Sequence, residues 1–422
     1  RDVMAYAFQG LGSKPAEVKY RFNWTAPILV SQHAPSVIYH AGNVVLKSAN
    51  RGNQWEEVSP DLTQNDTTNL DYGGGPITKE GAGGEVYHTI AYLAESPHDA
   101  SMLWTGSDDG LVHVTQDGGK NWSNVTPSEI GEALINTIEV SPHEPGTAYF
   151  AITRYKFIDF TPHIFKTTDY GNSWTRLVDG IDDEAFVRVV REDPQRKDLL
   201  YAGTETGLYI SFNGGQQWQP FQLNLPVVPV TDLQVHRNDL VAATQGRAFW
   251  ILDDLTPLHQ LNNRVKEAST FLFQPRDTYK TDGSRDTTAV ALGENPVNGT
   301  AIYYYLDEVP EDDSLALTLE IMNEADSVIR IYTSDAEKEP QKAPKKSGMN
   351  HWVWNLYQND YEEVKGLMPF QGMQSYRVMP GEYQVRLAYG EDTLTQSFSV
   401  LMDPRVLATE AHLAEKVEHL VT

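Results

Sequence analysis

An eight-residue box that occurs four times constrains the fold of this chain more than any other feature. Its pattern is Ser/Thr-x-Asp/Asn-x-Gly-x-x-Trp, in the copies SANRGNQW, TQDGGKNW, TTDYGNSW and SFNGGQQW. The Asp or Asn can accept hydrogen bonds from turn amides, the glycine suits a positive φ, and the tryptophan packs between sheets. Each box therefore predicts a structural hairpin turn with a packing anchor. The positions concerned are Asn50, Asp117, Asp169, Asn213, Trp55, Trp122, Trp174 and Trp218.

A longer unit repeats around each box in a constant order. A turn and a short strand precede the box, a short strand follows it, and a fifth copy without a box begins near Val235. The box tryptophans are 67, 52 and 44 residues apart. Four short strands per unit, separated by Gly, Pro, Asn and Asp, predict an all-β fold, a β-propeller with one four-stranded sheet per blade. A helical solenoid would need an apolar period near 3.6, which these runs lack.

The repeats place five propeller blades in residues 1–265, with residues 1–19 as the trailing part of an earlier blade. Five blades in an open arc would leave exposed sheet edges, which soluble proteins avoid. We therefore expect the blades to be part of a larger ring, with the missing blades or another protein chain as a partner. The chain is expected to be a fragment of a larger protein.

The pattern changes after the last blade. Residues 266–300 are rich in turn residues and predict a linker. Residues 301–403 contain separate short runs of alternating apolar and polar residues, which favour a β-sandwich of the immunoglobulin or fibronectin III type. Residues 404–422 have helical spacing and predict the start of a C-terminal helix.

Composition excludes several classes of function. The net charge is −25 without a basic stretch, so nucleic acid and anionic membrane surfaces are poor partners, and no apolar run is long enough to be inserted in a membrane. Cysteine is absent, which removes thiol catalysis and thiolate metal sites. No motif for a metal ion or a cofactor is present, and none is predicted.

The boxes and the runs GSDDGLVHVTQDGGKNW, LLYAGTETGLYISFNGG and GRAFWILDDLTPL resemble the Asp-box (BNR) repeat propeller superfamily, which includes sialidases, xyloglucan-cleaving hydrolases and sortilin. The closest resemblance is to large secreted bacterial propellers labelled glycosyl-hydrolase-like or sortilin-like. It covers residues 20–260 and implies a propeller that is secreted, periplasmic or on the cell surface. It also implies that the box carboxylates lie at the blade periphery and are not catalytic.

Candidate site residues lie in the loops between the second and third strands of each unit, on the face opposite the boxes. The acids Asp108, Asp109 and Glu205 could supply the two carboxyl groups, about 5–9.5 Å apart, that glycoside hydrolysis requires. The alternative is that Asp-Asp-Gly and Glu-Thr-Gly are tight turns whose acids cap amides in solvent.

Basic and aromatic residues on the same loops are candidates for ligand binding, namely Tyr155, Arg154, Arg188 and Arg247. An arginine cluster with Tyr155 would resemble a sialidase site, although the Arg-Ile-Pro motif of sialidases is absent. The run RVVRED, which contains Arg188 and Arg191, equally fits an inner strand whose arginine pairs with acids of neighbouring blades. The sequence thus favours a module that binds a glycan or a peptide, or a scaffold. A glycoside hydrolase of sialidase or xyloglucanase type is the alternative.

Overall fold

The computed structural model describes residues 3–8, 13–71, 86–281, 293, 295–296, 298–310, 314–338, 341–359 and 375–421. The chain divides into two compact units, unit 1 from Arg1 to Leu252 and unit 2 from Asp253 to Thr422. This division lies earlier than the expected end of the propeller at residue 265. The expected linker 266–300 also contains two strands of unit 2, as described below.

The described residues of unit 1 form five antiparallel sheets whose strands follow chain order, which confirms the predicted β-propeller blades. Blade 1 contains β1 (Ile28–Val30), β2 (Ile38–Ala41), β3 (Val45–Ser48) and β4 (Glu56–Glu57); blade 2 contains β5 (Ile90–Glu95), β6 (Leu103–Ser107), β7 (Val112–Thr115) and β8 (Ser123–Asn124). Blade 3 contains β9 (Leu134–Val140), β10 (Ala148–Thr153), β11 (Ile164–Thr167) and β12 (Thr175–Arg176); blade 4 contains β13 (Val187–Glu192), β14 (Leu200–Thr204), β15 (Leu208–Ser211) and β16 (Gln219–Pro220). Blade 5 has the strands β17 (Val230–His236), β18 (Asp239–Thr244) and β19 (Phe249–Leu252).

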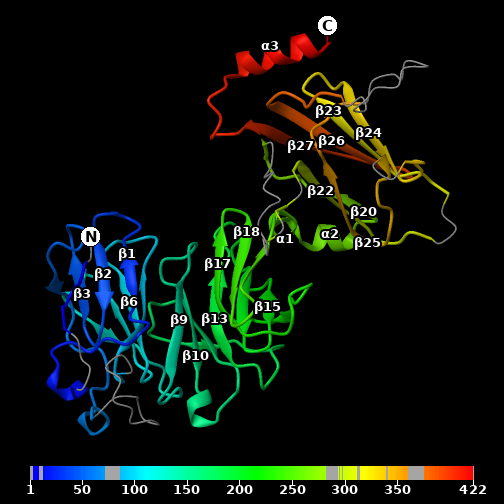
Figure 1. Ribbon diagram of the computed structural model, residues 1–422. Helices are drawn as coiled ribbons and strands as arrows, with labels where there is room; N and C mark the ends of the chain where they lie inside the picture. The colour runs from blue at the N-terminus through cyan, green and yellow to red at the C-terminus, as the bar shows by residue number, and fades with distance from the viewer. Residues whose placement is uncertain are drawn as a thin grey trace. The chain divides into compact units, whose positions relative to one another are not determined.

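The first strand of each blade is the inner one, and the inner strands follow one another along unit 1. Figure 1 shows β1, β9, β13 and β17 in this order, from blue to green. Apolar clusters fill the spaces between consecutive blades. One joins Leu103 of blade 2 to Tyr39 of blade 1, and another joins Phe150 of blade 3 to Trp104 of blade 2. Blade-on-blade packing is therefore the source of the core in unit 1.

The boxes form the turns between the third and fourth strands, as predicted. In the second box, Asp117 Oδ1 accepts hydrogen bonds from Thr115 Oγ1 (2.9 Å) and from the Asn121 amide (2.9 Å). The Asn121 side chain also donates to Asp117 Oδ2 (2.7 Å), and the bonds from Asn121 lower the pKa of the half-buried Asp117 to about 2. Gly119 has φ 96°, and a Cβ there would lie 2.4 Å from the Val58 carbonyl oxygen. The box glycine is required by both the turn and the close approach of the preceding blade.

The box tryptophans tie each blade to the preceding one. Trp122 donates its indole N–H to the Val58 carbonyl (2.8 Å), Trp174 to Val125 (2.7 Å) and Trp218 to Leu177 (3.1 Å). Trp218 is fully buried, whereas the tryptophans of the other three boxes are half-buried. The packing anchor of the box is therefore also a directional hydrogen bond between blades.

Histidines in the turns after the inner strands of blades 1, 2 and 3 connect each of these blades to the next one. The Nε2 of His33 lies 2.8 Å from the Ser96 carbonyl oxygen, that of His98 lies 3.0 Å from Ser141, and that of His143 lies 2.7 Å from Asp193. A carbonyl oxygen can only accept, so Nε2 carries the proton in each case. These recurring histidines are structural.

Unit 2 contains a β-sandwich of the expected immunoglobulin type. One sheet has the order β20-β22-β25 and the other β21-β27-β26-β23-β24, with β21 parallel to β27. Side chains of both sheets, among them Tyr304, Trp354 and Phe398, form one core. The strands are β20 (Thr270–Leu272), β21 (Thr278–Lys280), β22 (Thr300–Leu306), β23 (Thr318–Asn323), β24 (Val328–Thr333), β25 (Gly348–Trp354), β26 (Gly381–Tyr389) and β27 (Asp392–Met402). Because β20 and β21 belong to these sheets, the sandwich begins within the segment expected to be a linker.

Short helices complete the chain. They are η1 (Pro15–Glu17), η2 (Thr67–Asn69) and η3 (Tyr155–Phe157) in unit 1, and α1 (Thr256–Gln260), α2 (Asn263–Glu267) and α3 (Glu410–Val421) in unit 2. The C-terminal helix therefore starts six residues later than the expected residue 404. Within the described ranges, no helix has both the length and the apolar character needed to cross a membrane.

Candidate ligand-binding site

The sequence-predicted residues lie on the face of unit 1 opposite the boxes. In blades 1 to 4 the turn between the first and second strands and the box turn lie at one end, so the loop between the second and third strands lies at the other. This end of the blades, called the rim below, carries the loops after β6, β10, β14 and β18. The candidate acids, arginines and Tyr155 all belong to these loops or to the strands beside them.

Asp109 is fully buried and connects two segments of the rim by hydrogen bonds. Its carboxylate accepts hydrogen bonds from Ser107 Oγ (2.5 Å), His88 Nδ1 (2.5 Å) and the Gln64 amide (2.8 Å). His88 is buried as well, and Gln64 Nε2 donates to the Asp109 carbonyl (2.6 Å). The sequence had offered catalysis or amide capping in solvent for this acid. The structure instead makes it a buried link between the connection before β5 and the loop after β6.

Asp108 lies in an environment that raises its pKa. Its two oxygens accept hydrogen bonds from the Thr89 amide and the Thr89 hydroxyl, both at 2.8 Å. Burial raises the pKa of Asp108 to about 7, and the neighbouring Asp109 charge acts in the same direction against the bonds from Thr89. Asp108 lines a cavity with Tyr87, Tyr155 and Lys156 whose volume is about 20 Å³. This space suits one water molecule and not a sugar ring.

Glu205, Arg188 and Tyr155 do come together, along with a residue that the sequence reasoning missed. Arg188 donates from Nε and Nη2 to Glu205 Oε2 at 2.8 and 2.7 Å. Its guanidinium lies over the rings of Phe186 (5.1 Å) and Tyr155 (5.8 Å), and these two rings stack with centroids 5.4 Å apart. We call Tyr155, Phe186, Arg188 and Glu205 the ledge. Phe186 gave no signal in the sequence because it lies in a connection between blades, outside the repeat pattern.

The loop beside the ledge exposes apolar side chains. Arg154 is paired with Asp159 (3.2 Å) across the base of this loop. Between them, Ile158 has φ 61° and is 85% exposed, and the nearby Phe160 is 46% exposed. A β-branched residue at positive φ is rare and strained, so the loop holds Ile158 outward at a cost. Arg247 lies apart from these groups, exposed on the loop after β18, where it donates to the Gly246 carbonyl (3.0 Å).

A second hollow, which the sequence did not predict, lies along the inner strands. It is an open groove with a volume of about 420 Å³, lined by residues of β1, β5, β9, β13 and β17 and of the turns after them. Ligand pockets usually have volumes of roughly 300–1,000 Å³. The available signal was the run of polar residues Glu139, Arg191 and Gln234 at one repeat position of successive inner strands.

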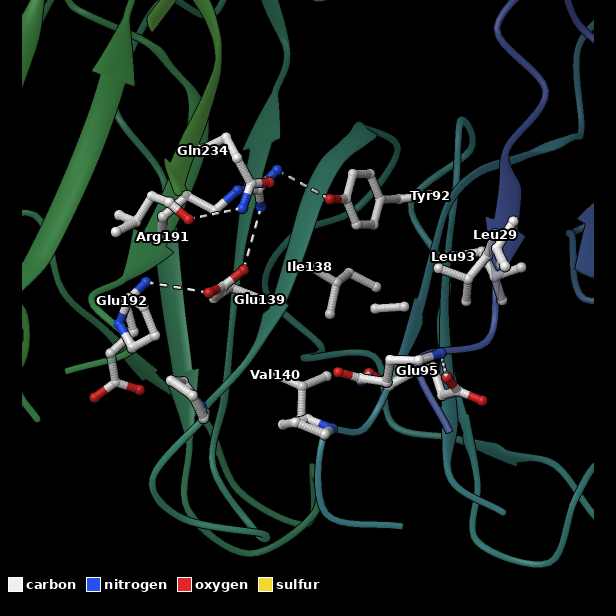
Figure 2. A pocket seen from close by; sticks show the side chains of 17 residues that line it. Leu29, Tyr92, Leu93, Glu95, Ile138, Glu139, Val140, Arg191, Glu192 and Gln234 are labelled. Carbon is white, nitrogen blue, oxygen red and sulfur yellow. Dashed lines mark hydrogen bonds and ion pairs between the residues drawn. The ribbon is translucent and has the colours of Figure 1, made fainter. Parts of the chain in front are cut away.

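Arg191 contacts residues of three other inner strands that line this groove. It donates to Asp232 (2.8 Å), Tyr92 Oη (3.0 Å) and the Leu233 carbonyl (2.8 Å), and its Nη1 lies 3.4 Å from Glu139. Figure 2 shows Arg191 reaching toward Tyr92 on the other side of the groove, with the Glu139 carboxylate beside its guanidinium. The interpretation of RVVRED as an inner strand paired across blades is therefore confirmed for Arg191. Arg188, in contrast, belongs to the ledge.

The groove makes the stability of unit 1 depend on pH through Glu139. Burial raises the pKa of Glu139 from 4.5 to about 7, although the Arg191 charge opposes the shift. The folded state therefore binds this proton more tightly than the unfolded chain, and the resulting stabilisation is complete below about pH 4.5 and is lost as pH rises through about 7. The difference in the free energy of unfolding between Glu139→Gln and the parent should shift in favour of the variant by about 1–3 kcal/mol when the pH rises from about 5 to about 7.5. Urea titrations at both pH values measure this gain, and a difference between the two proteins that does not change with pH would contradict it.

Among the described residues, no group of three or more His, Asp or Glu side chains is arranged to hold a metal ion.

Comparison with known proteins leaves the family open. No protein-family model and no curated protein sequence matches the chain. A GH74 xyloglucanase from Xanthomonas campestris is similar over 54% of this chain and 36% of its own, with 17% identity and a TM-score of 0.40. A GH74 enzyme from Niastella koreensis is similar over 89% of this chain and 57% of its own (11% identity, TM-score 0.40). The β-propeller domain of Swd1 from Myceliophteria thermophila is similar over 79% of this chain and 98% of its own (12% identity, TM-score 0.40).

The chain thus corresponds to about a third to somewhat more than half of the two enzymes' lengths. At these identities and TM-scores, the likenesses fix neither a family nor an activity. The β-propeller blades are instead established by strand order and by the repeated contacts between blades.

Proposed function

We propose that unit 1 is an Asp-box propeller of a secreted, periplasmic or cell-surface protein that binds a glycan or a peptide on its rim without cleaving it. One observation carries this proposal: the rim acids are engaged with internal partners, while aromatic and apolar side chains remain exposed beside them. Asp109 is buried, and Glu205 is held by Arg188. Tyr155, Ile158 and Phe160 have surface to offer. The location outside the cytoplasm rests on the resemblance of the sequence motifs.

The ledge has the chemistry of a binding surface. The half-exposed Tyr155 ring, stacked on the buried Phe186, gives a rigid apolar contact area at low cost in side-chain entropy, and Arg188 beside it adds hydrogen-bond donors. Arg188 is already oriented by Glu205, so little freedom is lost when a ligand contacts it. A sugar ring or an aromatic or aliphatic peptide side chain would fit this combination.

A glycoside hydrolase is the second candidate because of Asp108. A carboxyl group with a pKa near 7 can donate a proton at neutral pH, as the general acid of a hydrolase must. Two observations weigh against it. The cavity at Asp108 has a volume of only about 20 Å³, and Glu205 is paired with Arg188. A second carboxylate that is free to act is therefore missing from these candidates.

The binding proposal is tested by probing the full chain on glycan and peptide arrays and then measuring the affinity of Tyr155→Ala for each hit. Removing the ring takes away the centre of the ledge, so the affinity should fall at least about tenfold, the range of an interface hot spot. Arg247→Ala is the matched control, since Arg247 lies apart on another loop, and it should change the affinity less than about twofold. Equal losses in both variants, or no hit on either array, would contradict ligand binding at the ledge.

A further inference from the structure

We propose that the open side of blade 1 binds a further propeller blade of the same boxed repeat. This side, called the blade-1 flank, consists of the outward side chains of β1, Ile28 and Val30, together with the Ser31 carbonyl and Trp55. The inference does not depend on the ligand at the rim. It rests on contacts that recur between the other blades and that lack a partner here.

The inner strand of blade 1 is exposed where all the others are covered. Its Ile28 is 69% exposed, whereas the residues at the same register position of blades 2 to 5 are 0–5% exposed. Those residues are Leu93, Ile138, Val190 and Leu233. Val30 is 54% exposed, and its counterparts Glu95, Val140, Glu192 and Val235 are at most 9% exposed. In blades 2 to 5 the preceding blade supplies the cover, so β1 lacks the neighbour that its sequence is suited to.

The box tryptophan of blade 1 lacks the acceptor that the others have. Trp122, Trp174 and Trp218 donate to a carbonyl of the preceding blade. The Nε1 of Trp55 is buried and has no hydrogen-bond partner in the described part of the chain. A buried donor without an acceptor costs about 1–3 kcal/mol. The position of Val58 and Val125 is occupied here by Val3, and a further blade would hold this segment so that its carbonyl can accept from Trp55.

The surroundings of the box glycine of blade 1 show where the outer end of the further blade would lie. A Cβ on Gly171 would meet Val125 Cβ at 2.7 Å, and one on Gly119 would meet Val58 Cβ at 3.0 Å. A Cβ on Gly52 would meet Val3 Cγ1 at 2.1 Å. Val3 therefore occupies the place that Val58 and Val125 occupy in the blades before blades 2 and 3, directly after a fourth strand. It marks the outer end of the further blade, whose first three strands would cover β1.

The histidine contacts between blades indicate that the Ser31 carbonyl is a third part of the blade-1 flank. His33, His98 and His143 each donate to the carbonyl of the residue that follows the inner strand of the next blade. The equivalent residue in blade 1 is Ser31, which is buried and whose amide bonds to Val37 as Ser96 does to Met102. The further blade is therefore expected to place a turn histidine, or another donor, against the Ser31 carbonyl.

The occupant is a boxed blade and not a second copy of blade 5. In each of the four blade interfaces of the described chain, the preceding blade carries a box and four strands. Blade 5 has neither a box nor a fourth strand in this region, and it has Asn238 where the other turns have a histidine or Gln195. A boxed blade supplies the apolar cover and the turn donor together.

Photo-crosslinking in the source cells tests the proposal. Benzoylphenylalanine is placed at Ile28 in the native protein, with Leu223 as a control position of similar exposure (66% against 69%) away from the flank. We expect Ile28 to crosslink to a peptide from a repeat that contains Ser/Thr-x-Asp/Asn-x-Gly-x-x-Trp outside residues 1–422, at a yield at least five times that at Leu223. Crosslinks only to residues 1–422, as from a second copy, or a yield no higher than the control, would overturn the proposal.

A matched pair of substitutions gives an independent readout. In the chain of 422 residues, Trp122→Phe breaks a bond between blades and should lower the melting temperature by several degrees more than Trp55→Phe, which breaks none. In the native protein with the further blade bound, the two shifts should become equal. If the shift for Trp55→Phe stays the smaller one in both proteins, no blade satisfies Trp55 and the proposal fails.

Discussion

Trp218→Ala should lower the free energy of unfolding of unit 1 by about 3–5 kcal/mol, the range for truncating a buried aromatic side chain. Trp218 is 2% exposed and packs with Ile181 and Tyr209 between blades 3 and 4. Its indole N–H also bonds to the Leu177 carbonyl (3.1 Å). The variant would lose a large contact area and leave that carbonyl without its donor. A urea titration of the full chain measures the loss.

Trp218→Phe is the matched control for this effect. It keeps most of the apolar volume and removes the N–H donor, so it should cost about 1–2 kcal/mol. An alanine variant that loses less than about 1 kcal/mol would show that the box tryptophan does not anchor one blade to the next.

Asp109→Ala should destabilise unit 1 by about 3–5 kcal/mol, because breaking a buried charged network leaves its remaining groups without hydrogen-bond partners. The buried Ser107 and His88, together with the Gln64 amide, would lose their acceptor at once. Thermal or urea unfolding measures this change. The loss should be the same with or without any rim ligand, since Asp109 has no surface to offer one.

Asp117→Ala is the comparison variant. Asp117 also accepts several hydrogen bonds, but it is only half-buried, in a box turn that water can reach, so its loss should cost about 1 kcal/mol. An Asp109 variant no less stable than the Asp117 variant would contradict the structural role given to Asp109.

Local sequence patterns predicted the blades well because their determinants are local. A box places a Thr or Ser, an Asp or Asn and a Gly within five residues, and the turn bonds close between those same residues. The recurrence of the box then fixed the repeat and the all-β class. The sandwich was predicted from alternation in the same way, but its first strands β20 and β21 were missed because each is only three residues long and lies among turn residues.

The site depends on contacts between residues far apart in sequence. Asp109 bonds to His88, 21 residues away, and to Gln64, 45 residues away, so the Asp-Asp-Gly motif alone could not distinguish a solvated turn from a buried link. Arg188 and Arg191 are three residues apart in one strand, yet the first joins the ledge and the second the groove. A register shift between Val187 and Val189 lies at the position of Arg188.

Turnover and binding measured on one panel of chromogenic glycosides and polysaccharides distinguish most directly between a binding module and a hydrolase. The parent chain is compared with the double variant Asp108→Asn, Glu205→Gln, after both have been shown to be folded. We predict no turnover by the parent, and affinities of the double variant within a few kcal/mol of the parent for any bound glycan. Turnover by the parent that disappears in the folded double variant would contradict the proposed function and establish the rim acids as catalytic.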